Sequence, residues 1–315
     1  MHFDPSVAAP WNGGVGVLLF FIVSGYCIAM TAEKADNISK FWLQRFARLQ
    51  PALMACIVIT LIFVSTLGLP GREVSMIDAV HNALWIPLFS PTPLVDGAYW
   101  SLLEEAKFYF VFGLMYYLCR SRILLLFGCF TVIGAVLQIY RIGADHHAAI
   151  FPFKGMARPY FFYPYSIFFL MGIAARRSNY GVQTGIFLVA AIAIWKFWGN
   201  SLSTVWTILA ISIVGIVGVQ MRGFRIWRPI TFVGLISYPL YLIHQNVGVA
   251  TIRALQPAVN DPYLRIAIAT SIVLILAAFV AWSVEHRFRR AIETFAMRMV
   301  AFDPRSHQSI PPEAR

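Results

Sequence analysis

The chain has 315 residues, of which 59% are hydrophobic and only 12% are charged. Its mean hydropathy is +0.70, which is too high for a soluble domain that must cover its surface with polar groups. These values exclude a soluble globular protein and indicate an integral membrane protein. The formal charge of +11 could suggest a nucleic-acid-binding protein, but the basic residues lie in short segments between apolar runs. We therefore expect a lipid bilayer as partner and no nucleic acid.

Apolar runs long enough to cross a bilayer recur along almost the whole chain. About 20 helical residues cross roughly 30 Å of hydrocarbon, whereas a barrel strand would alternate apolar and polar residues. We predict an all-α, polytopic helical bundle whose nine spans lie near residues 13–31, 50–69, 98–118, 123–140, 160–175, 182–198, 203–221, 233–252 and 264–284. Residues 1–290 would form one membrane domain, and residues 291–315 would form a polar cytoplasmic tail.

The basic residues alternate between the two sides of this predicted bundle. Every second connection, starting with residues 32–48 and ending with residues 285–315, is rich in Lys and Arg, with 17 in total. The intervening connections hold 4. This positive-inside pattern places the C-terminus in the cytoplasm and residues 1–12 outside.

Three charged residues interrupt the predicted span at 98–118. Each would cost about 2.5 to 3.5 kcal/mol at the centre of a bilayer, so each needs a partner, water or a function. Glu104 and Lys107 are three positions apart and can pair on one helical face, which leaves Glu105 without a local partner. Glu105 is therefore either a functional carboxylate or a structural hydrogen-bond acceptor between helices.

Two further pairs of residues have both a structural and a functional interpretation. Arg45 and Arg48 are three apart and share a face at the predicted cytoplasmic edge of a helix. They either fix the topology or hold a phosphate-bearing ligand that arrives from the cytoplasm. Ser24 and Gly25 lie inside the first apolar run, where they either allow close helix packing or let a cofactor approach the backbone.

A polar stripe is predicted in the span at 233–252. Ser237, Tyr241, His244 and Gly248 fall at helical spacing on one face, and Pro239 could kink the helix. The stripe indicates a face that looks into the bundle, and His244 is either a satisfied structural residue or a catalyst. The four cysteines have no metal-ligand spacing, so we expect no metal. His146 and His147, in a predicted outside loop, are either solvated residues or metal ligands.

The order of the motifs resembles that of membrane acyltransferase family 3, which includes O-antigen and nodulation-factor O-acetyltransferases. The motifs extend from His2 to residue 290 and read GGVGVLLFFIVSGYCI, FWLQRFARLQPAL, YWSLLEEAKFY, GLISYPLYLIHQ and WSVEHRFRR. The resemblance implies ten membrane helices and the transfer of an acyl group, usually acetyl, from cytoplasmic acyl-CoA to a glycan or glycolipid hydroxyl.

The resemblance also implies roles for individual residues. His2 is similar to the family's catalytic histidine, and Glu105 to the acid of its WSLxxE motif, which here includes Trp100 and Ser101. Arg45 and Arg48 match its RxxR pair. Ser24 and Gly25 match an SGF-like element, in which Tyr26 replaces the usual aromatic residue. Acetyl-CoA or another acyl-CoA would be the donor.

One departure from the family pattern concerns the first helix. Family members carry an arginine eleven positions before the histidine, but here only Met1 precedes His2. We expect that the natural protein begins about 15 to 20 residues earlier, which would supply a tenth helix of about 20 residues. The alternatives to an acyltransferase are a transporter or flippase of a lipid-linked saccharide and a degenerate, non-catalytic relative.

Overall fold

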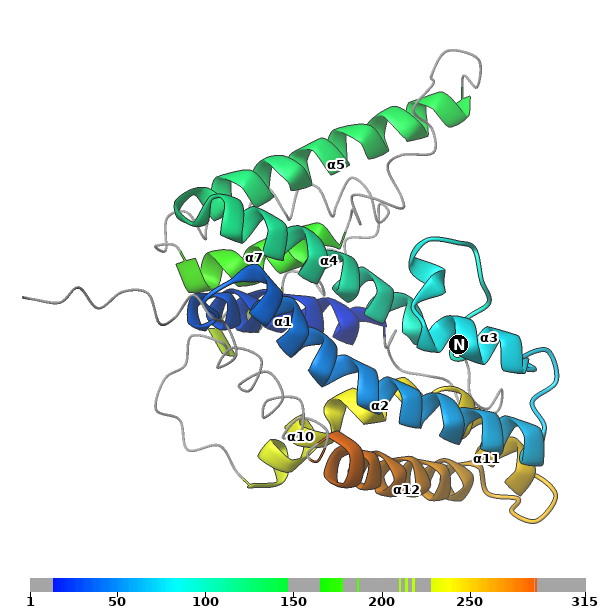
Figure 1. The fold of residues 1–315 in the computed structure, drawn as a ribbon. Coiled ribbons are helices and arrows are strands. Elements are labelled where there is room, and N and C mark those ends of the chain that lie inside the picture. The colour runs from blue at the N-terminus through cyan, green and yellow to red at the C-terminus, as the bar shows by residue number, and fades with distance from the viewer. Residues whose placement is uncertain are drawn as a thin grey trace, which may run out of the picture.

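The computed structural model describes residues 14–146, 165–177 and 228–285, together with the isolated positions 186, 210, 213–214, 217–218 and 287. In these residues the chain is helical and contains no strand, in agreement with the all-α prediction (Figure 1). His2 and the tail at 291–315 lie outside the described residues, as do the predicted spans at 182–198 and 203–221 apart from those isolated positions.

The described helices follow the apolar runs of the sequence. In chain order they are α1 (Gly14–Lys34), α2 (Ile38–Leu67), α3 (Met76–Ala83), α4 (Tyr99–Leu118), α5 (Ile123–His146), α7 (Ser166–Arg177), α10 (Arg228–Ile243), α11 (Asn246–Leu255) and α12 (Pro262–Val280). The short turns are η1 (Ile86–Leu88), η2 (Arg120–Arg122) and the π-helical η3 (Ala281–Glu285).

Four described stretches are long and apolar enough to cross a membrane. They are Gly16–Lys34, Ile38–Leu67, Arg120–Leu137 and Pro262–Val284. The helix α4 is of similar length, but it carries the three charges noted above. The structure is thus that of a membrane helical protein, and the total of nine spans stays a prediction.

The helices α1 and α7 lie side by side with their backbones almost in contact (Figure 1). A Cβ atom on Gly25 would lie 2.3 Å from the backbone oxygen of Phe169, and one on Gly172 would lie 2.0 Å from that of Ile22. Small residues allow this approach between membrane helices, where dispersion contacts and not hydrophobic burial drive association.

Aromatic side chains fill the space between α4 and this pair of helices. The Phe108 ring stacks on that of Phe169 with centroids 4.1 Å apart, and the centroid of the Phe21 ring lies 4.6 Å from that of Phe169. All three side chains are fully buried. This packing fixes α4 against α1 and α7 and therefore sets which face of α4 looks into the bundle.

The helices α10, α11 and α12 pack on the other side of α2 (Figure 1). The predicted span at 233–252 is two helices, because the chain breaks at residues 244–245, between α10 and α11. The predicted polar stripe is wrong at its N-terminal end, because Ser237 is exposed and does not face the interior of the bundle. Its hydroxyl donates a hydrogen bond to the backbone oxygen of Gly234.

The helix α2 begins twelve residues earlier than the span predicted at 50–69. The Asn37 side chain caps it by accepting a hydrogen bond from the backbone N–H of Lys40, which starts the helix at Ile38. As a correction to the sequence prediction, Arg45 and Arg48 lie within this helix and not at its edge.

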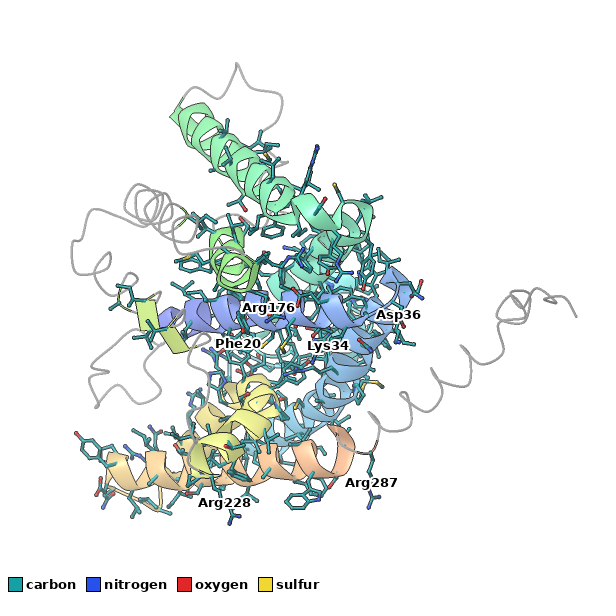
Figure 2. The ribbon with its side chains drawn as sticks, turned by 90° about the vertical axis from the view of Figure 1, so that its left-hand side faces the viewer. Phe20, Lys34, Asp36, Arg176, Arg228 and Arg287 are labelled. Carbon is teal, nitrogen blue, oxygen red and sulfur yellow. The ribbon has the colours of Figure 1, made fainter. Side chains whose placement is uncertain are left out.

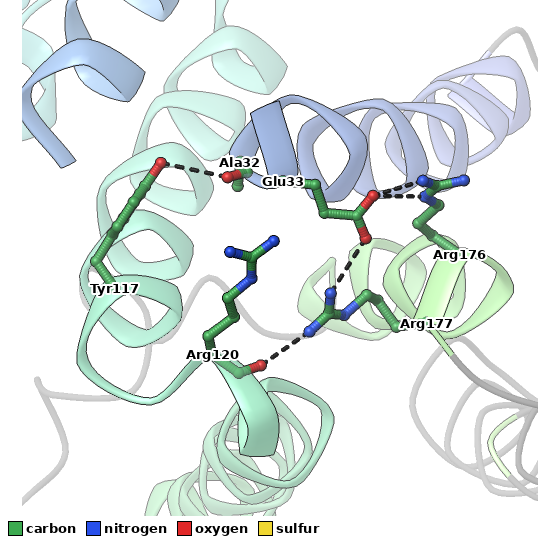
Figure 3. Close-up of polar contacts among 6 residues, drawn as sticks. All are labelled: Ala32, Glu33, Tyr117, Arg120, Arg176 and Arg177. Carbon is green, nitrogen blue, oxygen red and sulfur yellow. Dashed lines mark hydrogen bonds and ion pairs between the residues drawn. The ribbon is translucent and has the colours of Figure 1, made fainter. Parts of the chain in front are cut away.

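An ion-pair cluster joins three helices at the end of the bundle where α1 finishes (Figure 3). Glu33 accepts hydrogen bonds from Arg176, at 3.0 Å to Nε, and from Arg177, at 3.1 Å. Arg177 also donates to the backbone oxygen of Arg120, and the Tyr117 hydroxyl donates to that of Ala35. These contacts tie α1, α4 and α7 together at the predicted cytoplasmic side.

Candidate functional site

Glu105 lies on the buried face of α4, with only 4% of its surface exposed. The Ser24 hydroxyl of α1 donates a hydrogen bond of 2.8 Å to its Oε1 atom, and the Tyr109 hydroxyl, one helical turn further along α4, donates to the same oxygen. Because burying an unsatisfied carboxylate is costly, these two donors are what make the position tolerable inside the bundle.

The two arginines of α2 reach the same region. Arg45 and Arg48 both interact electrostatically with Glu105, and Arg45 also interacts with Tyr109 and Cys27. The Nε atom of Arg45 is buried and has no hydrogen-bond partner among the described residues. The site thus combines a carboxylate with guanidinium groups, one of which keeps an N–H group without a hydrogen-bond partner among the described residues.

The way α2 packs along α4 brings Arg45 of α2 to the same height in the bundle as Glu105 of α4. Trp42 donates a hydrogen bond of 3.2 Å from Nε1 to the backbone oxygen of Tyr109. Gly113 makes room for this contact, since a Cβ atom there would lie 2.6 Å from the indole nitrogen. Arg45 is three residues beyond Trp42 on α2, so it lies about 4.5 Å further along the helix axis, next to Glu105.

Ser101 and Tyr241 form a second polar contact one turn before Glu105 on α4. The Ser101 hydroxyl donates to that of Tyr241 at 2.7 Å. His244 lies beside them, with its ring centroid 5.4 Å from that of Tyr241. Trp100 instead faces an aromatic cluster, where its ring lies 5.0 Å from that of Tyr165 and 6.3 Å from that of Phe21.

The predicted pair between Glu104 and Lys107 is confirmed, with 2.8 Å between Oε1 and Nζ. The pair lies away from the buried face of α4 and leaves Glu105 as the interior carboxylate of this segment. Among the residues that the structure describes, no group of three or more His, Cys, Asp or Glu side chains could hold a metal ion.

The structure brings together most of the predicted site residues. Ser24, Arg45, Arg48 and Glu105 meet in one cluster, although they come from three motifs. Gly25 faces the Phe169 backbone of α7 and not this cluster. Sequence reasoning missed Tyr109, whose spacing of four residues from Glu105 could have revealed it, and Asp96, which comes just before the motif of α4.

Comparison with known proteins places the chain in a family. Residues 6–284 match the sequence model of acyltransferase family 3, described as an acyltransferase domain. The chain belongs to this family. No solved structure matches it.

Three curated relatives are similar to parts of the chain. The acyltransferase MdmB of Streptomyces mycarofaciens is 31% identical over 35% of this chain and 30% of its own length. An O-acetyl transferase of Shigella phage Sf6 is 28% identical over 46% of this chain and 49% of its own length. The peptidoglycan O-acetyltransferase OatA of Listeria monocytogenes is 29% identical over 32% of this chain and 19% of its own length. The chain therefore spans half or less of the length of each relative.

Proposed function

We propose that this protein is a membrane O-acyltransferase that moves an acyl group, acetyl in the first instance, from cytoplasmic acyl-CoA to a hydroxyl of an extracytoplasmic or lipid-linked glycan. Family membership supports acyl transfer, and two of the relatives are named as O-acetyltransferases. The apolar helices fit a lipid bilayer. A bacterial inner membrane, with the C-terminus in the cytoplasm, is the location that this proposal requires.

The enclosed carboxylate of Glu105 is the observation that carries the proposal. It receives hydrogen bonds from two helical positions and lies in the field of two arginines. A group of this kind inside a membrane bundle is costly, and such groups in membrane helices mark functional sites by default. Four of the family's motif residues contribute to this one cluster.

The proposed reaction forms an ester from a thioester. The oxygen of the acceptor hydroxyl bonds to the carbonyl carbon of the acyl group, and the bond from that carbon to the CoA sulfur breaks. His2 takes the hydroxyl proton as general base and returns it to the departing thiolate. Alternatively, His2 first accepts the acyl group itself and then passes it to the acceptor. Glu105 orients or charge-stabilises the histidine.

The donor is held by the arginines in this proposal. Arg45 and Arg48 bind phosphate groups of CoA, which planar guanidinium groups recognise through paired hydrogen bonds. The pantetheine arm then runs between the helices toward the end of the bundle where α1 begins. In this proposal the route passes Glu105, and it therefore also passes Ser24, whose hydroxyl is hydrogen-bonded to Glu105.

Membranes that contain the protein, incubated with acetyl-CoA labelled in the acetyl group, test the proposal. We expect label in the glycan fraction as an ester that mild alkali releases, together with one free CoA thiol for each ester formed. Glycan movement across the membrane without consumption of acetyl-CoA would instead identify a transporter. Membranes from cells without the gene are the control.

A further inference from the structure

The break between α10 and α11 lies at the end of the bundle where α1 and α4 begin. His244 and Gln245 form the break, and Asn246 starts the next helix. Phe20, near the beginning of α1, belongs to the same end, and Lys34 and Asp36 lie at the opposite end (Figure 2). By the predicted topology, this is the extracytoplasmic end.

Asp96 fixes the break against the start of α4. Its side chain is fully buried, and its two oxygens accept hydrogen bonds of 2.8 Å from the backbone N–H groups of Ala98 and Asn246. The Asn246 side chain returns a bond of 2.8 Å to the backbone oxygen of Val95 and accepts one of 3.0 Å from Arg72. The loop before α4 and the break therefore form one rigid unit.

The backbone oxygen of Tyr241 determines which nitrogen of His244 carries a proton. The Nδ1 atom lies 2.7 Å from the backbone oxygen of Tyr241. A carbonyl oxygen can only accept, so Nδ1 must be the donor, and in the neutral ring Nε2 keeps its lone pair. No described residue hydrogen-bonds to Nε2, and the side chain is only half-buried. His244 thus offers a hydrogen-bond acceptor of fixed orientation.

Tyr241 offers a donor beside it. The single Ser101 hydroxyl proton has two acceptors in reach, the Tyr241 hydroxyl at 2.7 Å and the backbone oxygen of Ala98 at 3.3 Å. When Ser101 donates along the shorter contact, the phenolic proton of Tyr241 is left for another acceptor. The Phe20 ring lies nearly parallel to that of Tyr241, at an interplanar angle of 4° with centroids 6.4 Å apart, and 42% of its surface is exposed. A donor on α10, an acceptor in the break that follows it and an apolar ring face on α1 are thus gathered together.

We propose that Tyr241 and His244, with Phe20, form the subsite that binds a sugar ring of the acceptor. Neighbouring sugar hydroxyls both donate and accept, so one can donate to His244 Nε2 while the other accepts from Tyr241. The C–H face of the ring can pack on Phe20. Ser101 and Asp96 are positioning residues, which orient the two recognition groups. This inference rests on the proposed function, because it names where the acceptor of that reaction binds.

Kinetics with the full-length protein in membranes test the subsite. The probes are labelled acetyl-CoA and solubilised envelope glycan from the expressing cell, each varied in turn. We expect His244→Ala and Tyr241→Phe each to raise the KM for the glycan about tenfold, as for loss of one hydrogen bond in a binding site, with the KM for acetyl-CoA within about twofold of the wild-type value. Ser237→Ala, an exposed position on the same helix, is the matched control.

A conservative variant separates recognition from folding. His244→Gln keeps a side-chain oxygen near the place of Nε2 and should recover most of the glycan affinity, whereas His244→Asn should not. An unchanged KM for the glycan in both His244→Ala and Tyr241→Phe would overturn the subsite, as would a rise confined to the KM for acetyl-CoA. If the wild-type protein transfers no acetyl group to glycan, the proposed function itself fails.

Discussion

Ser24 of α1 and Glu105 of α4 share a hydrogen bond of 2.8 Å, although 81 positions separate them in the chain. The side chains of Ser24 and Glu105 are both buried, and the bond joins two sequence motifs. It also fixes the Glu105 carboxylate beside the arginines of α2. The following predictions depend on this arrangement and on the helix contacts around it.

The charge of Glu105 is needed for transfer. We expect Glu105→Gln, which keeps the size and one acceptor oxygen, to lower the rate of acetyl transfer by about 10²- to 10⁴-fold, as for loss of a catalytic carboxylate. Glu104→Gln, the matched control one residue away, should stay within about threefold because its pair with Lys107 lies outside the cluster around Glu105. Equal losses in the two variants would contradict the assignment.

Arg45 should act on donor binding. Arg45→Ala is expected to raise the KM for acetyl-CoA by about 10- to 100-fold, the loss typical of hydrogen bonds to a charged group. Arg45→Lys should restore little, since an ammonium group lacks the planar fork. Lys40→Ala removes a cation of α2 that pairs with the exposed Asp36, just before the helix, and it should leave this KM unchanged. An unchanged KM in Arg45→Ala would remove the phosphate role.

Gly25 and Gly172 are required for packing. A methyl group at either position would meet backbone atoms that cannot move aside, so Gly25→Ala and Gly172→Ala should each destabilise the protein by about 1 to 3 kcal/mol. Thermal unfolding in detergent measures this loss. Gly16→Ala, on α1 with open space around it, should leave the Tm unchanged. A stable Gly25→Ala variant with a raised KM for acetyl-CoA would instead favour a donor-binding role.

Asp96 should give the stability a recognisable pH dependence. Burial raises the pKa of its carboxyl above the ordinary value of 3.8, and hydrogen bonds from backbone N–H groups oppose this only in part. The folded protein therefore holds the proton more tightly than the unfolded chain does. This contribution is largest below pH 3.8 and is lost as the pH rises through the folded-state pKa.

Comparison with Asp96→Asn isolates this effect, because the amide does not titrate. We expect the Tm of the wild type minus that of Asp96→Asn to shrink as the pH is raised from about 3 to 7. A difference that grows over the same range would show that the carboxyl has a lowered pKa. The variant should also be less stable at low pH by about 1 to 3 kcal/mol, since an amide cannot accept from both backbone N–H groups without facing one of them with its own donor.

His2 is expected to be essential for transfer. His2→Ala should abolish acetylation while the protein remains inserted in the membrane at the wild-type level. Immunoblots of washed membranes, together with the label assay, check both statements. Activity that survives in His2→Ala would show that the general base is another residue.

Much of this fold was accessible from the sequence because membrane helices must satisfy their own backbone groups. The apolar runs gave α1, α4 and α12 to within a few residues. The start of α2 was missed because residues 38–50 are too polar to count as a span, although Asn37 is a good capping residue. The break after α10 was missed because the next helix continues the apolar pattern.

The site was accessible only in part. Spacing along one helix predicted the pair of Glu104 and Lys107, which depends on local geometry alone. The bond from Ser24 to Glu105 depends on how α1 and α4 pack, which no local pattern encodes. The network around Asp96 joins a loop to a helix break 150 residues later, and neither feature has a hydropathy signature.

The contact between Gly25 and Gly172 limits where a long substrate can pass between the helices. With the two backbones touching, neither a fatty acyl tail nor a pantetheine chain can slip between α1 and α7. Ser24 comes one residue before Gly25 and therefore lies about 100° away around α1, on the side that faces Glu105. A long, flexible substrate that reaches the buried acid therefore approaches from a side of α1 other than its contact with α7.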